Sequence, residues 1–327
     1  GFVLAIVGWS ISIMLHALAK SVSGFGLARF GLGVSEAGNW PGATKSNAEW
    51  FPIHERALAQ GIFNSGASLG GVVSAPLIAL LFIQFGWKGT FIAVGLLGFV
   101  WLIPWLIIMK ASPEGHPWLS DEERQYILTG QKSQDTDDAD IAAPSWLEML
   151  RYKQSWSVIA SRFFLDPVWW LFVSWLPIYL ADQFGFDVKQ IGLFAWVPFA
   201  GAALGAIVGG WAAGRMLKRG WSVNRTRKTV ITVGGAIMLP TLLATAGASD
   251  PVVAVLLIAV ILFGFQFAIG NIQTLPSDFF DGKSVGSLAG VGGTAAVVGV
   301  LITTWIVPAI TTTSYVPFFV LGAALVP

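Results

Sequence analysis

Cysteine is absent from this sequence, and charged residues are scarce. Only 11% of the 327 residues are charged, whereas a typical soluble domain carries about 25%. Without Cys the chain can form no disulfide, thiol nucleophile or cysteine-ligated metal site. The 19 basic and 18 acidic residues leave a formal net charge of +1, so no overall field would attract nucleic acid. Because 55% of the residues are hydrophobic, the composition favours a membrane protein over a soluble one.

Motifs of several enzyme classes are also missing. The sequence has no G-x-x-x-x-G-K-[ST] phosphate-binding loop, which argues against ATP-driven transport. The three histidines, His16, His54 and His116, have no second ligand at a spacing that would hold a metal. No serine lies in the setting of a hydrolase nucleophile. We therefore expect neither a metal nor a cofactor, and we expect that the protein is not an enzyme.

Long apolar runs are what the sequence does contain. A helix needs about 20 apolar residues to cross a bilayer, and runs near that length recur along the chain. The candidate spans are residues 1–19, 22–46, 57–85, 90–109, 156–182, 191–217, 228–248, 251–274 and 286–310, and a shorter run begins at Tyr315. The sequence therefore predicts an all-α polytopic membrane protein.

The connections between these spans alternate in charge. Lys and Arg concentrate in every second connection, and cytoplasmic loops are the ones that carry such an excess. The basic connections are those around residues 45–56, 110–153, 215–228 and 277–283. The opposite connections hold only Lys20, Lys88 and Lys189. This alternation supports the assignment of spans independently of hydropathy, and it predicts that the chain enters from the cytoplasmic side.

One long polar stretch, residues 110–155, divides the chain. We expect an amphipathic helix that is capped by Ser120, with Glu123 completing a capping box. An acidic run follows that can bury too little apolar surface to fold alone. We predict an N-terminal bundle over 1–109, a central cytoplasmic loop over 110–155 and a C-terminal bundle over 156–327. Because residue 1 is not Met and the last apolar run is short, we expect an internal fragment of a longer protein.

Arg29 and Glu36 are two charges inside an apolar, glycine-rich run. Seven residues apart on a helix, they lie within roughly 20° of one face and about 10 Å apart along the axis. An ionisable side chain near the middle of a bilayer costs about 3 kcal/mol or more and normally marks an ion or substrate path. Glu36 is thus a candidate proton site, and Arg29 is a candidate partner for a substrate carboxylate. The alternatives are that a neighbour neutralises Glu36 for structural reasons and that Arg29 extends to the membrane surface.

A second charged pair lies in the span that follows the polar stretch. Arg162 and Asp166 are four residues apart and can pair on one helix face. We expect Pro167 to break the helix beside them, which favours a structural latch. Trp169 and Trp170 follow near the middle of the span, where no interfacial aromatic belt is expected. One of them is therefore a candidate to stack on a sugar ring, and lipid contact is the alternative.

Amide side chains in apolar spans are the remaining polar candidates. Asn64, Asn271 and Gln273 would either join helices through hydrogen bonds or bind substrate hydroxyl groups. Small residues also recur at four-residue spacing over 201–214. Such ridges allow helix backbones to approach closely, and we expect either static packing or helices that slide.

Longer motifs show a family resemblance. They are RFGLGVSEAGNWPGATK from Arg29, AEWFPIHERALAQGIFNSGASLG from Ala48, DPVWWLFVSWLPIYL from Asp166 and NIQTLPSDFF from Asn271. Together they resemble the anion:cation symporter family of the major facilitator superfamily, and within it the hexuronate transporter branch. The resemblance covers most of the chain, and the combination is more specific than any one motif.

The resemblance implies a fold and an activity. The fold would be the major facilitator fold of two six-helix bundles, here without the first two helices and part of the last. The activity would be import of a sugar-acid anion, such as galacturonate or glucuronate, together with protons by alternating access in a bacterial inner membrane. The positions that match the family's coupling residues are Arg29 and Glu36, and a cavity position carries over to Gln273.

The sequence also departs from the family pattern. Galactonate-type relatives carry a glutamine where this chain has Ala67, which disfavours acyclic sugar acids and leaves Asn64 as the polar candidate of that helix. Gly214 stands where the basic gating signature usually has an aspartate, which weakens a charge latch there. The gating candidates are Glu55, Arg56, Arg162, Asp166 and Arg215.

These inferences lead to one expected function and to rivals. We expect the partners to be a sugar-acid anion, protons and the lipid bilayer, with no nucleic acid. The rival functions are a sodium-coupled or uncoupled carrier of another organic anion, and a membrane sensor that binds sugar acids without transporting them.

Overall fold

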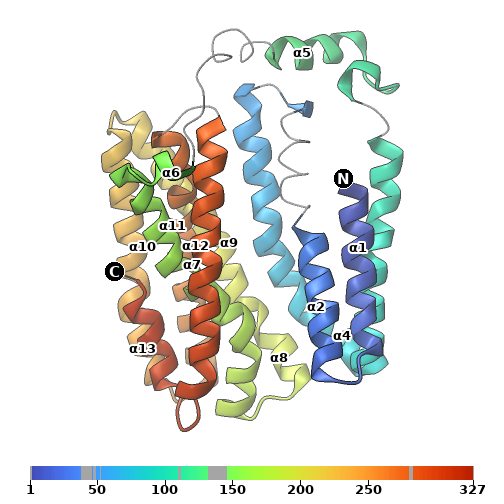
Figure 1. Ribbon diagram of the computed structural model, residues 1–327. Helices are drawn as coiled ribbons and strands as arrows, with labels where there is room; N and C mark the ends of the chain where they lie inside the picture. Colours follow the sequence, from blue (N-terminus) through green and yellow to red (C-terminus); the bar gives the residue numbers. More distant parts are fainter. Residues whose placement is uncertain are drawn as a thin grey trace. The chain divides into compact units, whose positions relative to one another are not determined.

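The computed structural model describes residues 2–37, 46, 49–51, 53–109, 112–131, 146–279 and 283–326. Of residues 53–65, 67, 68, 130, 131, 146, 147, 277 and 283–286 it describes the backbone alone. Every regular element in these ranges is a helix (Figure 1). Before the central stretch these are α1 (Phe2–Leu15), the 3-10 helix η1 (His16–Leu18), α2 (Val22–Glu36) and α4 (Ile53–Ile108). The central stretch contains η2 (Pro113–Gly115) and α5 (Asp121–Gln131). The helices after it are α6 (Trp146–Met149), α7 (Lys153–Phe184), α8 (Val188–Phe194), α9 (Trp196–Lys218), α10 (Val223–Ala246), α11 (Pro251–Phe279), α12 (Lys283–Ile310) and α13 (Val316–Ala324).

The long helix α4 is divided at Gly86. This residue has a φ of 63° and a ψ of −179°, a non-helical conformation that favours glycine. The break falls between the predicted spans 57–85 and 90–109. The sequence-based expectation of two spans in this region is therefore confirmed.

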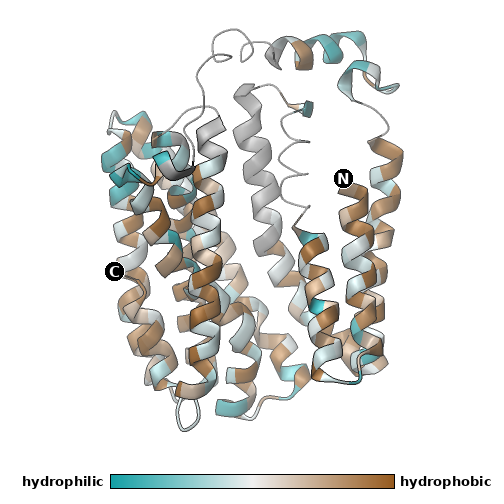
Figure 2. Ribbon diagram, in the orientation of Figure 1, coloured by the Kyte–Doolittle hydropathy of each residue, from teal (hydrophilic) through white to brown (hydrophobic). Residues whose placement is uncertain are grey.

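Six helical segments among the described residues are long and apolar enough to cross a membrane. They are Leu69–Ile108, Lys153–Phe184, Val188–Lys218, Val223–Ala246, Pro251–Pro276 and Ser287–Ile310. A shorter apolar helical stretch runs from Phe2 to Leu18. Figure 2 shows hydrophobic residues along the lengths of the helices and hydrophilic residues gathered toward several of their ends. This distribution is that of a multi-pass membrane protein.

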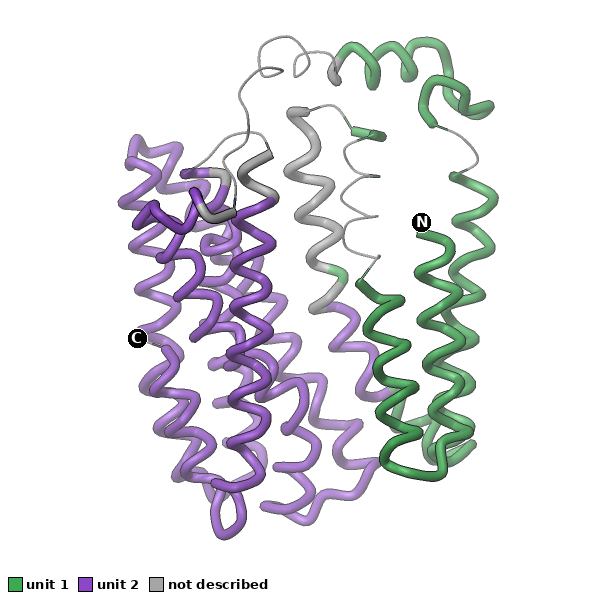
Figure 3. Tube along the Cα trace, viewed as in Figure 1, with its two compact units in different colours: residues 1–66, 77–140 green, residues 67–76, 141–327 purple. Residues whose placement is uncertain are grey.

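The chain forms two compact units (Figure 3). Unit 1 comprises residues 1–66 and 77–140, and unit 2 comprises residues 67–76 and 141–327. The short segment 67–76 thus packs with unit 2, where Gly71 lies against Phe199 of α9. The predicted division into bundles at 110–155 stays a prediction.

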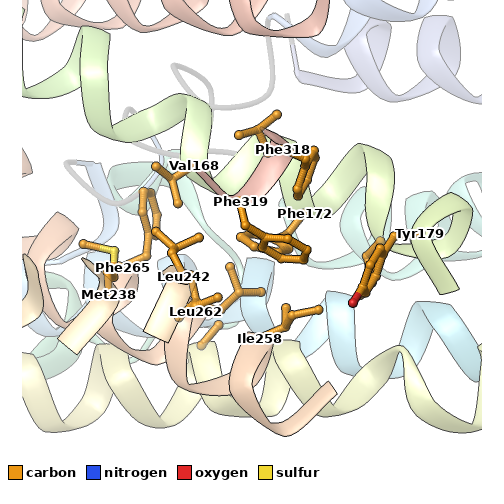
Figure 4. Packing of buried hydrophobic residues seen from close by; sticks show 14 of the residues in the cluster. Val168, Phe172, Tyr179, Met238, Leu242, Ile258, Leu262, Phe265, Phe318 and Phe319 are labelled. Atoms are coloured by element: carbon orange, nitrogen blue, oxygen red, sulfur yellow. The ribbon is translucent and has the colours of Figure 1, made fainter. Parts of the chain in front are cut away.

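The core of unit 2 is formed by apolar side chains of several helices (Figure 4). Residues of α7, α10, α11 and α13 meet there. The labelled members are Val168, Phe172, Tyr179, Met238, Leu242, Ile258, Leu262, Phe265, Phe318 and Phe319. The aromatic rings meet edge to face, as in the 5.8 Å contact between Phe172 and Phe318, an arrangement that adds to the stabilisation from burial.

Glycines set the distances between the helices of unit 2. Gly205 of α9 lies against the backbone carbonyl of Phe263 on α11, where no side chain would fit. Gly234 of α10 and Gly264 of α11 approach each other in the same way. The predicted small-residue ridge over 201–214 is thus used in part for close packing, since Gly210 and Gly214 face open space.

The expectation that Pro167 breaks its helix is wrong. Helix α7 continues through both Pro167 and Pro177. Proline has no N–H, so the carbonyl of Phe163, four residues earlier, loses its usual donor. That carbonyl lies directly against Gly299 of α12, where a side chain would clash. A proline is tolerated in a membrane-spanning helix when the carbonyl that it leaves without a donor is covered by a neighbouring helix rather than exposed to lipid.

The predicted cap of α5 is confirmed. The Glu123 N–H donates to the Ser120 hydroxyl at 3.2 Å, and the Ser120 N–H donates to the Glu123 carboxylate at 3.1 Å. This reciprocal pair is the capping box that the local sequence predicts.

Candidate functional site

Helix α2 carries the two charged residues that the sequence singles out. Both Arg29 and Glu36 lie within Val22–Glu36 and are exposed. Their seven-residue separation on a continuous helix places them on one face, within roughly 20° of each other. In the described part of the chain neither residue takes part in an ion pair. Among the described residues, therefore, no ion pair neutralises either charge.

The opposite side of α2 packs against α1 through small residues. Gly8 of α1 lies against the side chain of Ser35, and the hydroxyl of Ser12 lies against Gly31. At about 100° per residue, Arg29 and Glu36 lie roughly 150° around the helix from Gly31. The α1 contact therefore turns both charges away from α1.

A pocket of about 290 Å³ lies on the α1-facing side of α2. Its lining is uncharged and consists of Ser12, Leu15, Leu18, Ala19, Gly24, Leu27, Ala28 and Gly31. Neither Arg29 nor Glu36 belongs to this lining. A charged sugar acid would find no ionic partner there, so this pocket is not the candidate site.

Three candidates of α4 lie outside the described side chains. They are Glu55, Arg56 and Asn64, whose predicted roles stay predictions. Their backbone belongs to the first arm of α4.

Arg162 and Asp166 form the ion pair that their spacing predicts. The guanidinium Nη2 and Nε lie 2.7 and 2.9 Å from the same carboxylate oxygen, Oδ2 of Asp166. Asp166 is only 8% exposed, and its other oxygen, Oδ1, has no hydrogen-bond partner among the described residues. Gly292 of α12 lies near both Val158 and Arg162, so the pair borders the interface between α7 and α12. The prediction that these residues pair is confirmed.

The two tryptophans that follow have different surroundings. Trp169 stacks on Phe265 of α11 at 5.5 Å and meets the edge of Phe199 of α9 at 5.9 Å. Trp170 is 48% exposed. Of the two candidates for stacking on a sugar ring, Trp170 therefore has the more accessible ring.

The two amides of α11 also differ. Asn271 is 3% exposed, and its Oδ1 accepts a hydrogen bond of 2.8 Å from Nη1 of Arg227 on α10. Gln273 is exposed. Two positions apart on a helix, these side chains point in nearly opposite directions, about 160° apart around the axis. Asn271 thus joins α10 to α11, whereas Gln273 remains open.

Arg227 is also bound by a carboxylate that the sequence analysis did not select. Its Nε donates to Asp278 Oδ2 at 2.8 Å, and its Nη2 lies 3.4 Å from Oδ1. The signal was available in the order of the spans. Consecutive antiparallel helices bring the start of α10 and the end of α11 to the same side of the membrane.

Arg215, a predicted gating residue, has an aromatic neighbour. Its guanidinium carbon lies 5.5 Å from the ring centre of Trp211, one turn earlier on α9. In the described ranges no carboxylate forms an ion pair with it. The predicted gating role of Arg215 stays a prediction.

A second contact that sequence reasoning missed lies at the other end of unit 2. The Tyr315 hydroxyl, just before α13, donates to Oδ2 of Asp182 on α7 at 2.8 Å. The Tyr315 ring also meets the ring of Tyr179 at 5.1 Å. No local pattern connects residues that are 133 positions apart, so only the folded chain reveals this bond.

These features define a class of protein. Helices of membrane-spanning length, packed through glycines and carrying charged side chains, are typical of a polytopic membrane transporter. The chain belongs to the Major Facilitator Superfamily, whose family profile matches residues 1–304. It is therefore a multi-pass membrane protein of a family of transporters, not of enzymes.

Curated relatives share about a third of their residues with this chain. The hexuronate transporter of Escherichia coli K12 is 35% identical over 299 residues, which cover 90% of this chain and 68% of the relative. The galacturonate transporter of Dickeya chrysanthemi is 35% identical over 241 residues, or 73% of this chain and 69% of that protein. A probable sulfoacetate transporter of Cupriavidus necator is 31% identical over 97% of this chain and 73% of its own length.

A solved structure supports the fold. A bacterial homologue of the human lysosomal transporter Spinster, in an inward-facing and unoccupied conformation, aligns with a TM-score of 0.67. The alignment covers 91% of this chain and 64% of that one, so this chain spans less than two thirds of that protein. At 20% sequence identity the likeness concerns the fold alone. The predicted major facilitator fold is thereby confirmed.

Proposed function

We propose that the whole protein is a secondary active transporter that imports a hexuronate anion together with protons by alternating access. The relatives named for hexuronate and galacturonate transport, each 35% identical, support the substrate class. Their bacterial sources support a location in the bacterial inner membrane. The observation that carries the mechanism is the pair Arg29 and Glu36, two charges on one exposed face of α2 with no ion-pair partner in the described part of the chain.

The proposed roles follow from the chemistry of the side chains. Arg29 presents paired N–H donors that match a carboxylate, so it would bind the acidic group of the sugar. Glu36 would take up a proton when the substrate is bound and release it on the inner side.

The sugar ring and its hydroxyl groups need partners of a different kind. We assign them to the exposed residues Trp170 and Gln273 and to Asn64 on α4. Trp169 and Asn271 are held by protein neighbours and would act by supporting Trp170 on α7 and Gln273 on α11. We assign gating to the Arg162–Asp166 pair and to Glu55, Arg56 and Arg215, which lie in or beside the basic connections.

The test of the substrate is counterflow. Full-length protein in proteoliposomes would be loaded with glucuronate, galacturonate, galactonate or sulfoacetate, and uptake of labelled glucuronate would be measured. We expect exchange with the two uronates and little with galactonate. Exchange with sulfoacetate alone would instead favour the rival carrier of another organic anion, to which one relative points.

The test of the coupling is Glu36→Gln. The glutamine amide does not take up and release a proton near neutral pH. Uptake driven by a pH gradient should therefore be lost, while counterflow continues. Glu122→Gln on the exposed first turn of α5 is the matched control, because it removes a carboxylate outside the spans. Accumulation that survives in Glu36→Gln, or that follows a sodium gradient instead, would contradict proton coupling. Binding of glucuronate without any uptake by the unmodified protein would favour the sensor.

A further inference from the structure

One face of α9 is an exposed apolar stripe. Leu204, Ile207 and Trp211 are 58%, 65% and 62% exposed, and their three- and four-residue spacings align them along the helix. The glycines that pack against α11 lie on a different face, on average about 130° around the helix. Those glycines are Gly201, Gly205 and Gly209. The stripe is therefore turned away from the packed interior of unit 2.

The stripe ends in positive charge. Arg215 follows Trp211 by four residues, and its guanidinium carbon lies 5.5 Å from the centre of that ring. A cation over the face of an indole is held by the ring's negative quadrupole. Lys218, three residues later, is exposed on the same side. Along the stripe, aliphatic side chains are followed by tryptophan and then by cations, which is the order in which acyl chains, interface and headgroups follow in a bilayer.

The turn between α9 and α10 carries charge of one sign. No Asp or Glu occurs anywhere from residue 188 to residue 249. The exposed cations of this turn are Lys218, Arg219, Arg225 and Lys228, which add to Arg215. A second stack repeats the first, since the guanidinium carbon of Arg225 lies 4.1 Å from the ring centre of Trp221.

Arg227 provides the contrast within the same turn. Its charge is balanced by Asp278, and it also donates to Asn271. The exposed cations around it form no ion pair with any described carboxylate. These exposed cations are therefore free to bind an anion from outside the chain, whereas Arg227 is already neutralised by Asp278.

We propose that this face of α9 binds an anionic phospholipid of the cytoplasmic leaflet. The phosphodiester would lie between Arg215 and Lys218, and one acyl chain would lie along Leu204, Ile207 and Trp211. Clusters of Lys and Arg directly beside a membrane span bind acidic lipid headgroups, because the positive side chains lie at the level of the headgroups in the membrane. The lipid is distinct from the transported substrate, and the inference depends on the membrane location of unit 2 and on the predicted cytoplasmic position of the connection around residues 215–228.

The test counts bound lipid by native mass spectrometry. Full-length protein in a nonionic detergent is titrated with dioleoyl phosphatidylglycerol or, in parallel, with dioleoyl phosphatidylcholine. The double variant Arg215→Gln/Lys218→Gln should weaken phosphatidylglycerol binding about 30-fold, since each cation near a charged surface contributes about 1 kcal/mol and about 1.4 kcal/mol is tenfold. The control is Lys20→Gln/Lys189→Gln, which removes two exposed lysines from the opposite connections and should leave binding unchanged.

Further variants separate a lipid site from a change in folding. Arg215→Lys keeps the positive charge and should retain the preference for phosphatidylglycerol. Trp211→Leu keeps the apolar stripe but removes the indole, and it should weaken the binding of phosphatidylglycerol only in part. Glycerol phosphate, which has no acyl chains, should not displace the lipid at equal concentration. Equal binding of the two lipids, an equal loss in the control, or displacement by glycerol phosphate would each overturn the proposal.

Discussion

The two charged residues of α2 and the two ion pairs of unit 2 differ in whether a described residue of the protein supplies the partner of each charge. Arg29 and Glu36 share a face and are exposed, without an ion pair in the described ranges. Arg162 and Asp166 are 2.7 Å apart, and Arg227 and Asp278 are 2.8 Å apart. A paired charge in an apolar helix stabilises one packing arrangement, whereas an unpaired charge is available to a ligand or a proton. The comparison therefore separates charges that a described neighbour neutralises from charges that no described neighbour neutralises.

The largest effect is expected for Arg29→Gln. Loss of a charged partner for the substrate carboxylate costs about 3 kcal/mol or more, so uptake of glucuronate should fall at least about 100-fold. Thermal stability should change little, because the side chain is exposed. Arg151→Gln, an exposed arginine in the connection before α7, is the control. Uptake that remains within a few fold of the unmodified protein would place Arg29 among the structural charges.

A large effect on stability is expected for Asp166→Asn. The change leaves Arg162 partly buried without its counter-charge, which costs about 3 kcal/mol. The double variant Arg162→Gln/Asp166→Asn removes both charges and should recover part of that loss. Denaturant unfolding of the full-length protein in detergent measures both. A single variant as stable as the double variant would show that the unpaired Arg162 charge carries no penalty, and variants as stable as the unmodified protein would show that the ion pair does not stabilise the interface.

Arg227→Gln should have an intermediate effect. The variant leaves the Asp278 carboxylate without its cation and the Asn271 oxygen without its donor, a loss of about 2 kcal/mol. Lys228→Gln is the matched control one residue away, because that side chain is exposed. The same denaturant experiment applies. If both variants lose equal stability, the link between α10 and α11 contributes nothing specific.

The smallest effect is expected for Tyr315→Phe. It removes only the hydroxyl that donates to Asp182, and a hydrogen bond of this kind contributes about 1 kcal/mol. The ring contacts with Tyr179 and Phe318 remain possible in the variant. Asp182→Ala, which removes the acceptor, should give a loss of similar size, and the double variant should lose no more than either single one. Fully additive losses would show that the two residues do not interact.

Several features followed from local sequence. Gly86 divides α4 where hydropathy separated two spans, and Ser120 with Glu123 forms the expected capping box. The four-residue spacing of Arg162 and Asp166 was enough to predict their ion pair. Each of these depends on residues close together in the chain, whose relative placement is fixed once the helix forms.

Other features could not be read from local sequence. Asn271 and Gln273 looked equivalent as amides in an apolar span, yet one is buried against Arg227 and the other is exposed. Pro167 was expected to end its helix, but α7 continues through it. Gly299 of α12, which is far away in the sequence, covers the carbonyl that the proline leaves without a donor. In both cases the outcome depends on a neighbour from another helix.

The sequence by itself determined the membrane class, the helices and the family. Span length, hydropathy and the alternation of charge are properties of whole segments, so a few atypical residues do not change them. Only the tertiary structure decided which charges are paired and which faces are open. That decision depends on where glycines such as Gly205, Gly234 and Gly299 let one helix approach the backbone of another. The face of each helix that remains exposed is fixed by those contacts, since a side chain cannot both pack against a neighbouring backbone and meet a ligand.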